Sequence, residues 1–181
     1  MNRNFIAFTC VGALLLAGTA AQSQQNPPMN PPMMMGAMDK DFVTQASQGN
    51  LAEIKAADLA LMRSRDVNVR RLAHMVMEHH MMSQEQLRGT AMSMNSMLPE
   101  QMDTMMSEDY DKLEKLSGTG FDHAYIKQQI EAHKKAIWMF QRYQQETTDP
   151  HMRIWATGTT PTLKRHLMEF KYLWNKCITP H

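Results

Sequence analysis

The sequence has few cysteines, glycines and prolines, and neither sign of charge is in excess. Its 181 residues include 2 Cys, 8 Gly and 8 Pro, and 19 Lys and Arg residues stand against 18 Asp and Glu residues. So few cysteines exclude a disulfide scaffold, and the scarcity of turn residues argues against a β-sandwich or barrel. The balanced charge provides no chain-wide basic field for binding nucleic acid or an anionic membrane. The length fits one compact domain with a substantial core.

The first 21 residues have the features of a secretory signal peptide. Arg3 supplies a short basic region, an apolar run extends from Phe5 to Ala17, and small residues follow up to Ala21. A run of about 13 residues is short for a membrane span, so cleavage near Ala21 is favoured over an uncleaved anchor. We therefore expect a periplasmic protein, with outer-membrane association as an alternative. Its one remaining thiol, Cys177, is most simply a buried apolar residue.

Methionine is the residue in excess, with 20 copies in the chain. Five of them lie between Met29 and Met38, and ten lie between Met75 and Met106. Residues 22–38 consist of Gln, Asn, Pro, Met and small residues without any charge, which predicts a disordered tail. Methionine fills gaps in protein cores, but its thioether is also a ligand for soft metal ions.

Residues 39–181 predict an all-α domain, an up-down-up-down four-helix bundle with a short extra helix between helices two and three. The main helices are expected at about 40–64, 67–95, 121–146 and 150–177, and Pro161 should kink the last one. The expected N-caps are Asp39 or Asp41 for the first main helix, Asp66 for the second and Asp149 for the fourth. Ser107 is the expected N-cap of the short helix, which Gly118 and Gly120 should end.

Each main helix has an apolar stripe at spacings of three and four, and one ionisable residue interrupts each stripe. Glu53 and His80 lie almost equally far along the chain from the turn at Asp66, on either side of it. His133 and His166 flank the turn at Asp149 in the same near-symmetric way. If both turns lie at the same end of the bundle, these four side chains differ in depth by only about 6 Å. The sequence therefore predicts that one carboxylate and three imidazoles meet near the bundle centre.

Several segments resemble a bacterial envelope family known as domain of unknown function 4142, whose members are often labelled outer membrane proteins. They are FVTQASQGNLAEIKAADLAL from Phe42, residues 72–80, FDHAYIKQQIEAH from Phe121 and TPTLKRHL from Thr160. The resemblance extends from about residue 39 to residue 174 and implies an exported, ferritin-like four-helix bundle without a known activity. The recurrent polar positions that it implies are Glu53, His80, Asp122, Tyr125, His133 and His166. His79 departs from the family, which usually has an acidic residue there.

The four central residues fit a mononuclear metal site better than a di-iron site. Ferritin-like di-iron centres use Glu-x-x-His pairs, but Met77 and Leu163 stand three residues before His80 and His166. Three imidazoles and one carboxylate suit a single Zn, Cu or Fe ion. The alternative is a buried hydrogen-bonded cluster that holds no metal.

A second candidate site lies on the helix of residues 67–95, where His and Met residues recur at helical spacing away from the apolar stripe. Its residues are His74, Met75, Met77, His79, Met81 and Met82. Thioether and imidazole ligands favour Cu(I) and, by the same softness, Ag(I). Alternatively, these side chains form an adaptable contact surface for another envelope protein or have no specific role.

Together these patterns predict an exported, non-enzymatic protein that binds copper or silver for buffering, transport or resistance. Zn or Fe are the other candidate ions at the central site. The alternatives are an envelope interaction module whose His cluster is structural and, less favoured, a metal-dependent redox enzyme.

Overall fold

The computed structural model describes residues 35–178, and throughout this range the regular secondary structure is helical. The predicted signal peptide and most of the predicted tail lie outside the described residues, as does the side chain of Cys177. The helices are α1 (Ala37–Arg63), α2 (Val67–Ser93), α3 (Thr104–Glu114), α4 (Gly118–Glu146) and α5 (Pro150–Ile178). None of the helices in the described range is long and apolar enough to cross a membrane.

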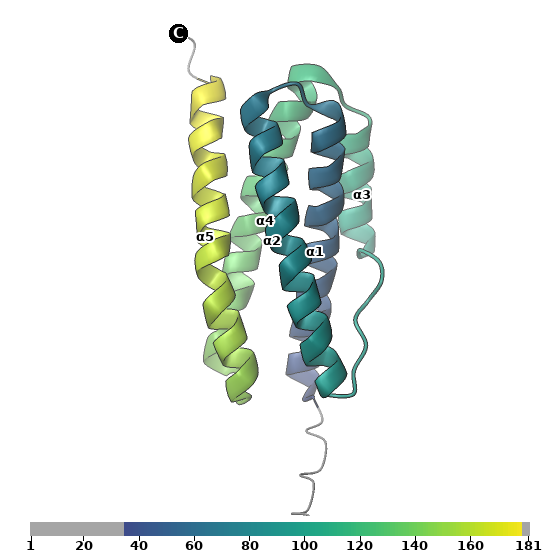
Figure 1. Cartoon of the computed structure of the whole chain (residues 1–181), viewed down its shortest axis with the longest axis vertical. Coiled ribbons are helices and arrows are strands. Elements are labelled where there is room, and N and C mark those ends of the chain that lie inside the picture. The colour runs from purple at the N-terminus through teal and green to yellow at the C-terminus, as the bar shows by residue number, and fades with distance from the viewer. Residues whose placement is uncertain (1–34, 179–181) are drawn as a thin grey trace, which may run out of the picture. The chain divides into compact units, whose positions relative to one another are not determined.

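Four long helices form the bundle, and the short helix α3 lies outside it (Figure 1). Helix α1 packs against α2 and α4, and α5 packs against α4 and α2, so the order around the bundle is α1, α2, α5, α4. Helix α3 packs on α1 and, less extensively, on α4. The predicted four-helix bundle with a short extra helix between its second and third helices is confirmed.

The direction of the helices differs from the predicted up-down-up-down order. Arg63 at the end of α1 donates a hydrogen bond to the carbonyl oxygen of Leu116, just before α4, at 3.0 Å. At the opposite end, Tyr143 of α4 contacts Asp39 of α1, so these two helices are antiparallel and the order is up-down-down-up (Figure 1). The connection that carries α3 is long enough to cross the bundle, as in ferritin-like folds with one long crossover.

The starts of α1, α3 and α4 differ from the expected positions. Helix α1 begins after Gly36, and Asp39, expected as its N-cap, is buried in the first turn. There Asp39 accepts hydrogen bonds from the hydroxyls of Tyr143 and Thr147 at 2.5 and 3.0 Å. Asp41, the other candidate cap, is exposed within α1. Because α1 begins at Ala37, the last residues of the predicted tail belong to the bundle.

The cap of α3 is Asp103 rather than Ser107. The Asp103 carboxylate accepts the backbone N–H of Met106 at 2.7 Å, so the helix begins one turn earlier than predicted. Gly118 and Gly120 lie in the first turn of α4 instead of ending α3. Gly118 has a φ of +59°, which a residue with a side chain would adopt only with strain.

A polar layer divides the apolar core into two clusters. One cluster contains Leu72, Phe121, Ile126 and Phe170, and the other contains residues such as Phe42, Leu87, Phe140 and Leu163. Along each long helix, the residues of the two clusters are separated by buried polar side chains. These side chains are Ser47, Asn50, Glu53, His80, Gln84, Gln129, His133 and His166. The bundle therefore places its polar groups at mid-height, between two conventional cores.

Candidate metal centre

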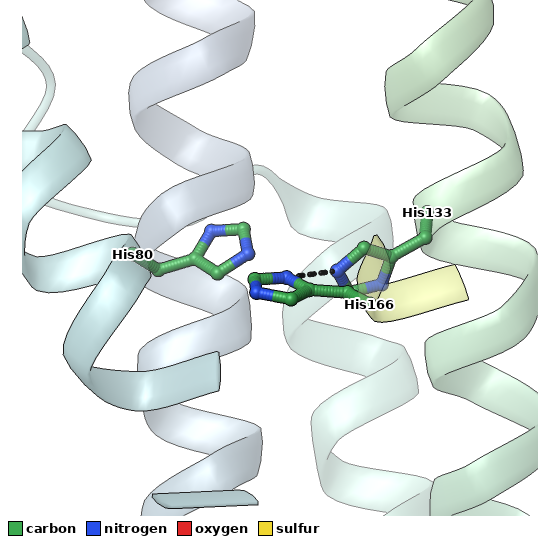
Figure 2. Close-up of side chains that lie close together, drawn as sticks. All are labelled: His80, His133 and His166. Carbon is green, nitrogen blue, oxygen red and sulfur yellow. Dashed lines mark hydrogen bonds between the residues drawn. The ribbon is translucent and has the colours of Figure 1, made fainter. Parts of the chain in front are cut away.

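Three histidines from three helices meet in the polar layer (Figure 2). His80 comes from α2, His133 from α4 and His166 from α5, and their exposed fractions are 6%, 1% and 0%. One ring nitrogen from each residue lies within 4.8 Å of the others. We call this group the three-His site. The predicted meeting of the histidines is therefore confirmed, although the turns at Asp66 and Asp149 lie at opposite ends of the bundle; each histidine stands near the middle of its helix.

His133 is held by its own helix. Its Nδ1 lies 2.9 Å from the backbone carbonyl oxygen of Gln129, one turn earlier in α4. A carbonyl oxygen only accepts hydrogen bonds, so Nδ1 carries the proton and Nε2 presents a lone pair to the site. That Nε2 lies 3.1 Å from Nδ1 of His166 (Figure 2). Histidine ligands of metals commonly have their second ring nitrogen anchored in this way.

His80 is held by a chain of hydrogen bonds that ends at the backbone carbonyl of Pro99. Ser47 donates its hydroxyl to that carbonyl at 3.4 Å and accepts from the Gln84 amide at 2.8 Å. Gln84 in turn accepts from the Asn50 amide at 3.1 Å, and the Asn50 oxygen lies 3.0 Å from Nδ1 of His80.

Each link of this chain fixes the donor and acceptor of the next link, starting from a carbonyl oxygen that only accepts. His80 is thereby held with its proton on Nδ1. Its Nε2, which has no hydrogen-bond partner and is buried, carries a lone pair. Two of the three imidazoles thus have the protonation of metal ligands before any ion is bound.

His79, expected on the outer surface of α2, contacts the three-His site from outside. Its side chain is half-buried, and its Nδ1 lies 2.8 Å from Nε2 of His166. The two rings are stacked, with centroids 5.0 Å apart. On its outer side, His79 Nε2 lies 3.4 Å from the guanidinium of Arg165. His79 therefore belongs with the buried site at least as much as with the surface.

Burial keeps the central imidazoles neutral. It lowers the pKa of His133 to about 4, although the hydrogen bond to the Gln129 carbonyl partly offsets this shift. Burial, reinforced by the neighbouring His133, lowers the pKa of His166 to about 3. The pKa of His80 is also well below its usual value, through burial first and then the nearby histidines. Neutral imidazole is the form that binds metal ions.

Glu53, predicted as the fourth member, is buried but does not belong to the three-His site. Burial raises the pKa of its carboxyl to about 8, partly offset by the side chain of Gln129. Glu53 is therefore mostly protonated at neutral pH. The pKa of the Tyr125 hydroxyl is well above its usual value, mainly because of burial and secondly because of the nearby Glu53 carboxylate. The carboxyl oxygen Oε2 and the Tyr125 hydroxyl are both buried without a hydrogen-bond partner.

Glu53 and the three histidines line one cavity of about 690 Å³, which extends between α1, α3 and α4. Charged side chains of both signs also line it, among them Lys112, Lys127, Asp109 and Glu131, together with apolar residues of α1 and α4. The cavity provides space from which an ion or water molecule can approach the polar layer.

The predicted ligands on the rest of α2 have mixed exposure. Met81 and Met82 are 51% and 57% exposed, and His74 is exposed beside Glu78, with 3.4 Å between its Nδ1 and a carboxylate oxygen. Met75 and Met77 are partly buried and pack against the core, although the sequence placed them away from the apolar stripe. Part of the methionine excess thus does serve packing.

These α2 residues also occupy two different sides of the helix. Successive residues are about 100° apart, so Met75, His79 and Met82 share one side, and Met77 and Met81 share another. His79 contacts α5, which places the first group on the flank of α2 next to α5.

A family model described as Domain of unknown function (DUF4142) matches residues 21–173. The chain belongs to the DUF4142 family. None of the curated proteins matches this DUF4142 protein in sequence.

Solved structures with a similar fold have low sequence identity. A DUF305 fragment from Deinococcus radiodurans is 14% identical, with 79% of this chain and 99% of that chain covered and a TM-score of 0.71. A Streptomyces coelicolor DUF305 protein, described as a candidate secreted protein, is 18% identical over 77% and 92% of the chains, with a TM-score of 0.66. CopM in its Cu(I)-bound form is 17% identical over 77% and 96%, with a TM-score of 0.64. CopM also appears in Ag-bound and Cu(II)-bound forms.

The DUF4142 protein also contains site residues that the sequence did not reveal. Ser47, Asn50 and Gln84 position His80, and Gln129 flanks both His133 and Glu53. A usable signal existed, since Ser47 and Asn50 are three residues apart and His80 and Gln84 are four apart, so that each pair shares a helix face. The same spacings of three and four also fit Gly49 and Ser83, which lie next to Asn50 and Gln84 in the chain, and both are half-buried.

Proposed function

We propose that this DUF4142 protein is an exported metal-binding protein for copper or silver, acting as a buffer, carrier or resistance factor. The three-His site is the candidate binding site, and His74, Met75, Met77, His79, Met81 and Met82 are candidate capture ligands. The observation that carries the proposal is the convergence of three buried, neutral imidazoles, two of which already present a lone pair.

The site fits an ion after a small contraction. Metal–nitrogen bonds of about 2.0–2.1 Å place the ligand nitrogens of a tetrahedral site about 3.4 Å apart. The nitrogens of the three-His site lie within 4.8 Å of one another, so rotamer adjustments of the rings can bring them to this spacing. A cation bound there would also favour ionisation of Glu53, which lines the same cavity. Glu53 is thus a candidate charge partner for the ion.

Copper and silver are favoured over Zn and Fe for two reasons. Exposed thioethers accompany the imidazoles on α2, and thioethers select soft ions. CopM, which shares the bundle, is described in Cu(I)-, Cu(II)- and Ag-bound forms. The predicted signal peptide and the candidate secreted neighbour support a location in the periplasm, where methionine is a durable ligand.

A structural role for the histidines is the second candidate, because the polar layer already satisfies most of its hydrogen bonds. In this reading the protein is an envelope interaction module, and its exposed methionines contact a partner.

Titration with Cu(I) under anaerobic conditions, against a chromophoric chelator, distinguishes the two candidates. We expect the wild-type protein to compete with the chelator and His133→Gln to bind more than tenfold more weakly, since it lacks a ligand. The matched control is His151→Gln, because His151 is exposed and distant from the layer in sequence. Repeating the titration with Zn(II) and Fe(II) ranks the ions. Equal binding by wild type and His133→Gln, with both folded by circular dichroism, would favour the structural role.

The contribution of the α2 methionines needs a separate comparison. Replacing Met75, Met77, Met81 and Met82 together by Leu keeps apolar volume and removes the sulfur atoms. We expect slower or weaker Cu(I) uptake than in a control with Met62→Leu, Met105→Leu and Met168→Leu, which are exposed elsewhere. Identical uptake in both variants would assign no ligand role to the α2 methionines.

A further inference from the structure

A hydrogen-bonded relay connects the interior of α4 to the surface of α5. It runs from the Gln129 carbonyl through His133, His166 and His79 to the Arg165 guanidinium. Its successive distances are 2.9, 3.1, 2.8 and 3.4 Å. The carbonyl only accepts hydrogen bonds and the guanidinium only donates them. Both ends therefore require the same direction of donation, from the surface inward.

This direction fixes the position of the proton on each ring. His133 donates from Nδ1 to the carbonyl, so its Nε2 must accept from Nδ1 of His166. Nε2 of His166 then accepts from Nδ1 of His79, and Nε2 of His79 accepts from Arg165. All three rings are neutral with the proton on Nδ1. Any other assignment of neutral rings would set two donors or two acceptors against each other.

His166 differs from the other two residues of the three-His site. His80 and His133 present lone pairs, whereas His166 presents an N–H to His133. Its remaining lone pair, on Nε2, is taken up by His79. In this arrangement His166 has no free lone pair for an ion and also covers the lone pair of His133.

We propose that His79 and Arg165 form a latch that holds His166 in the tautomer unable to bind a metal ion. The proposal rests on the proposed metal-binding function. Opening the latch reverses the hydrogen bond between His79 and His166 and breaks the one between His166 and His133. The proton on Nδ1 of His79 passes to Nε2 of His166, and His166 releases its Nδ1 proton to solvent. His79 takes a proton from solvent at Nε2, so no net proton is gained or lost and both rings stay neutral.

Reversal also requires Arg165 to leave. The new N–H at Nε2 of His79 would point at the guanidinium N–H, and two donors repel each other. Arg165 is exposed, so it can swing into solvent. Arg165 is therefore a positioning residue for the three-His site, although it would not touch the ion.

The tautomers can be read directly by long-range ¹H–¹⁵N NMR of the histidine rings. In the chelator-treated protein we expect His79, His133 and His166 all to carry the proton on Nδ1. After addition of Ag(I), which is diamagnetic, His79 should carry it on Nε2. A metal-free protein with His166 protonated on Nε2, or an Ag(I)-bound site that leaves His79 unchanged, would overturn the latch.

Affinity provides the second test, with Arg165→Met compared with Lys164→Met. Both substitutions remove one exposed positive charge from neighbouring positions of α5, but only Arg165 contacts His79. Loss of one such hydrogen bond should strengthen Ag(I) binding about two- to tenfold in Arg165→Met relative to Lys164→Met. Equal affinity of the two variants would overturn the latch alone. If the wild type and both variants bind neither Ag(I) nor Cu(I), the proposed function is overturned, and the latch with it.

Discussion

At the scale of single residues, the neighbours of each imidazole decide which nitrogen can act as a ligand. The Asn50 side-chain oxygen and the Gln129 carbonyl each accept a hydrogen bond from the Nδ1–H of one histidine. The sequence predicted His80 and His133 because each interrupts an apolar stripe. Asn50 was missed because spacings of three and four along α1 fit its neighbour Gly49 equally well, and only the structure shows that Asn50 is the more buried of the two. Tautomers depend on backbone carbonyls, which no residue pattern displays.

Glu53 should make the folded protein less stable as the pH rises towards 8. Its pKa is about 8 in the folded protein and near 4.5 when unfolded, so the folded state holds this proton more tightly. The associated stability is complete below pH 4.5 and is lost as the pH rises through 8. Between pH 6.5 and 8 we expect the free energy of unfolding to fall by up to about 1.4 kcal/mol per pH unit.

Urea unfolding of wild type and Glu53→Gln in the presence of a chelator checks this expectation. Glutamine keeps the size of the side chain without an ionisable group, so the variant should show a flatter profile from pH 6.5 to 8. Glu131→Gln, on the exposed surface of α4, is the control and should follow the wild type. Parallel profiles for wild type and Glu53→Gln would show that Glu53 is ionised in the folded state.

At the scale of elements, the sequence located helices more reliably than it located their caps. Asp66 and Asp149 were predicted correctly, and each accepts two backbone N–H groups of the helix that it begins. The prediction of Asp39 as an N-cap was wrong, because its carboxylate accepts hydrogen bonds from Tyr143 and Thr147 instead. A capping residue and a buried hydrogen-bond acceptor have the same side chain, and only the packed structure distinguishes them.

Removing the Asp66 carboxylate should destabilise the protein. Asp66 accepts the N–H groups of Asn68 and Val69 at 2.7 and 3.1 Å, which the helix itself leaves unpaired. Asp66→Ala should therefore lower the free energy of unfolding by about 0.5–2 kcal/mol, measured by urea denaturation followed by circular dichroism. Asp58→Ala, at an exposed position near the C-terminal end of α1, should change it by less than about 0.5 kcal/mol. A difference of zero between the two variants would mean that the α2 cap contributes nothing measurable.

At the scale of the whole molecule, the bundle was predictable and its connectivity was not. Heptad-like stripes and turn residues define four long helices, but they carry no information on which end a long connection reaches. Contacts such as that between Arg63 and Leu116 decide the direction, and they involve residues without a sequence signature. The histidines were still predicted to meet because each stands near the middle of its helix, and mid-helix positions coincide in either orientation.

The neutral histidines should make the whole bundle sensitive to mild acid. The pKa values of His133 and His166 fall from 6.5 to about 4 and about 3 on folding, so the unfolded state takes up protons first. Their stabilisation is complete above pH 6.5 and is lost as the pH falls towards 4 and 3. Each contributes up to about 1.4 kcal/mol per pH unit in this range.

The measurement is best made between pH 6.5 and 5, above the usual pKa of carboxyl groups, and in the Glu53→Gln background, which removes the opposing effect of Glu53. We expect the free energy of unfolding to fall by about 2–4 kcal/mol over this interval. Adding His123→Gln and His151→Gln, two exposed positions, should leave the slope unchanged. A constant free energy of unfolding across the interval would mean that the central imidazoles take up protons as readily in the folded protein as in the unfolded chain.

The pairing of the helices has a consequence for how the three-His site is put together. Helices α1 and α2 form one hairpin, α4 and α5 form another, and these two pairings are the most extensive in the bundle. His80 belongs to the first hairpin, and His133 and His166 belong to the second. Neither hairpin contains a complete set of imidazoles. The site is therefore complete only when the two hairpins are docked against each other, and an ion bound there would hold the two halves of the molecule together.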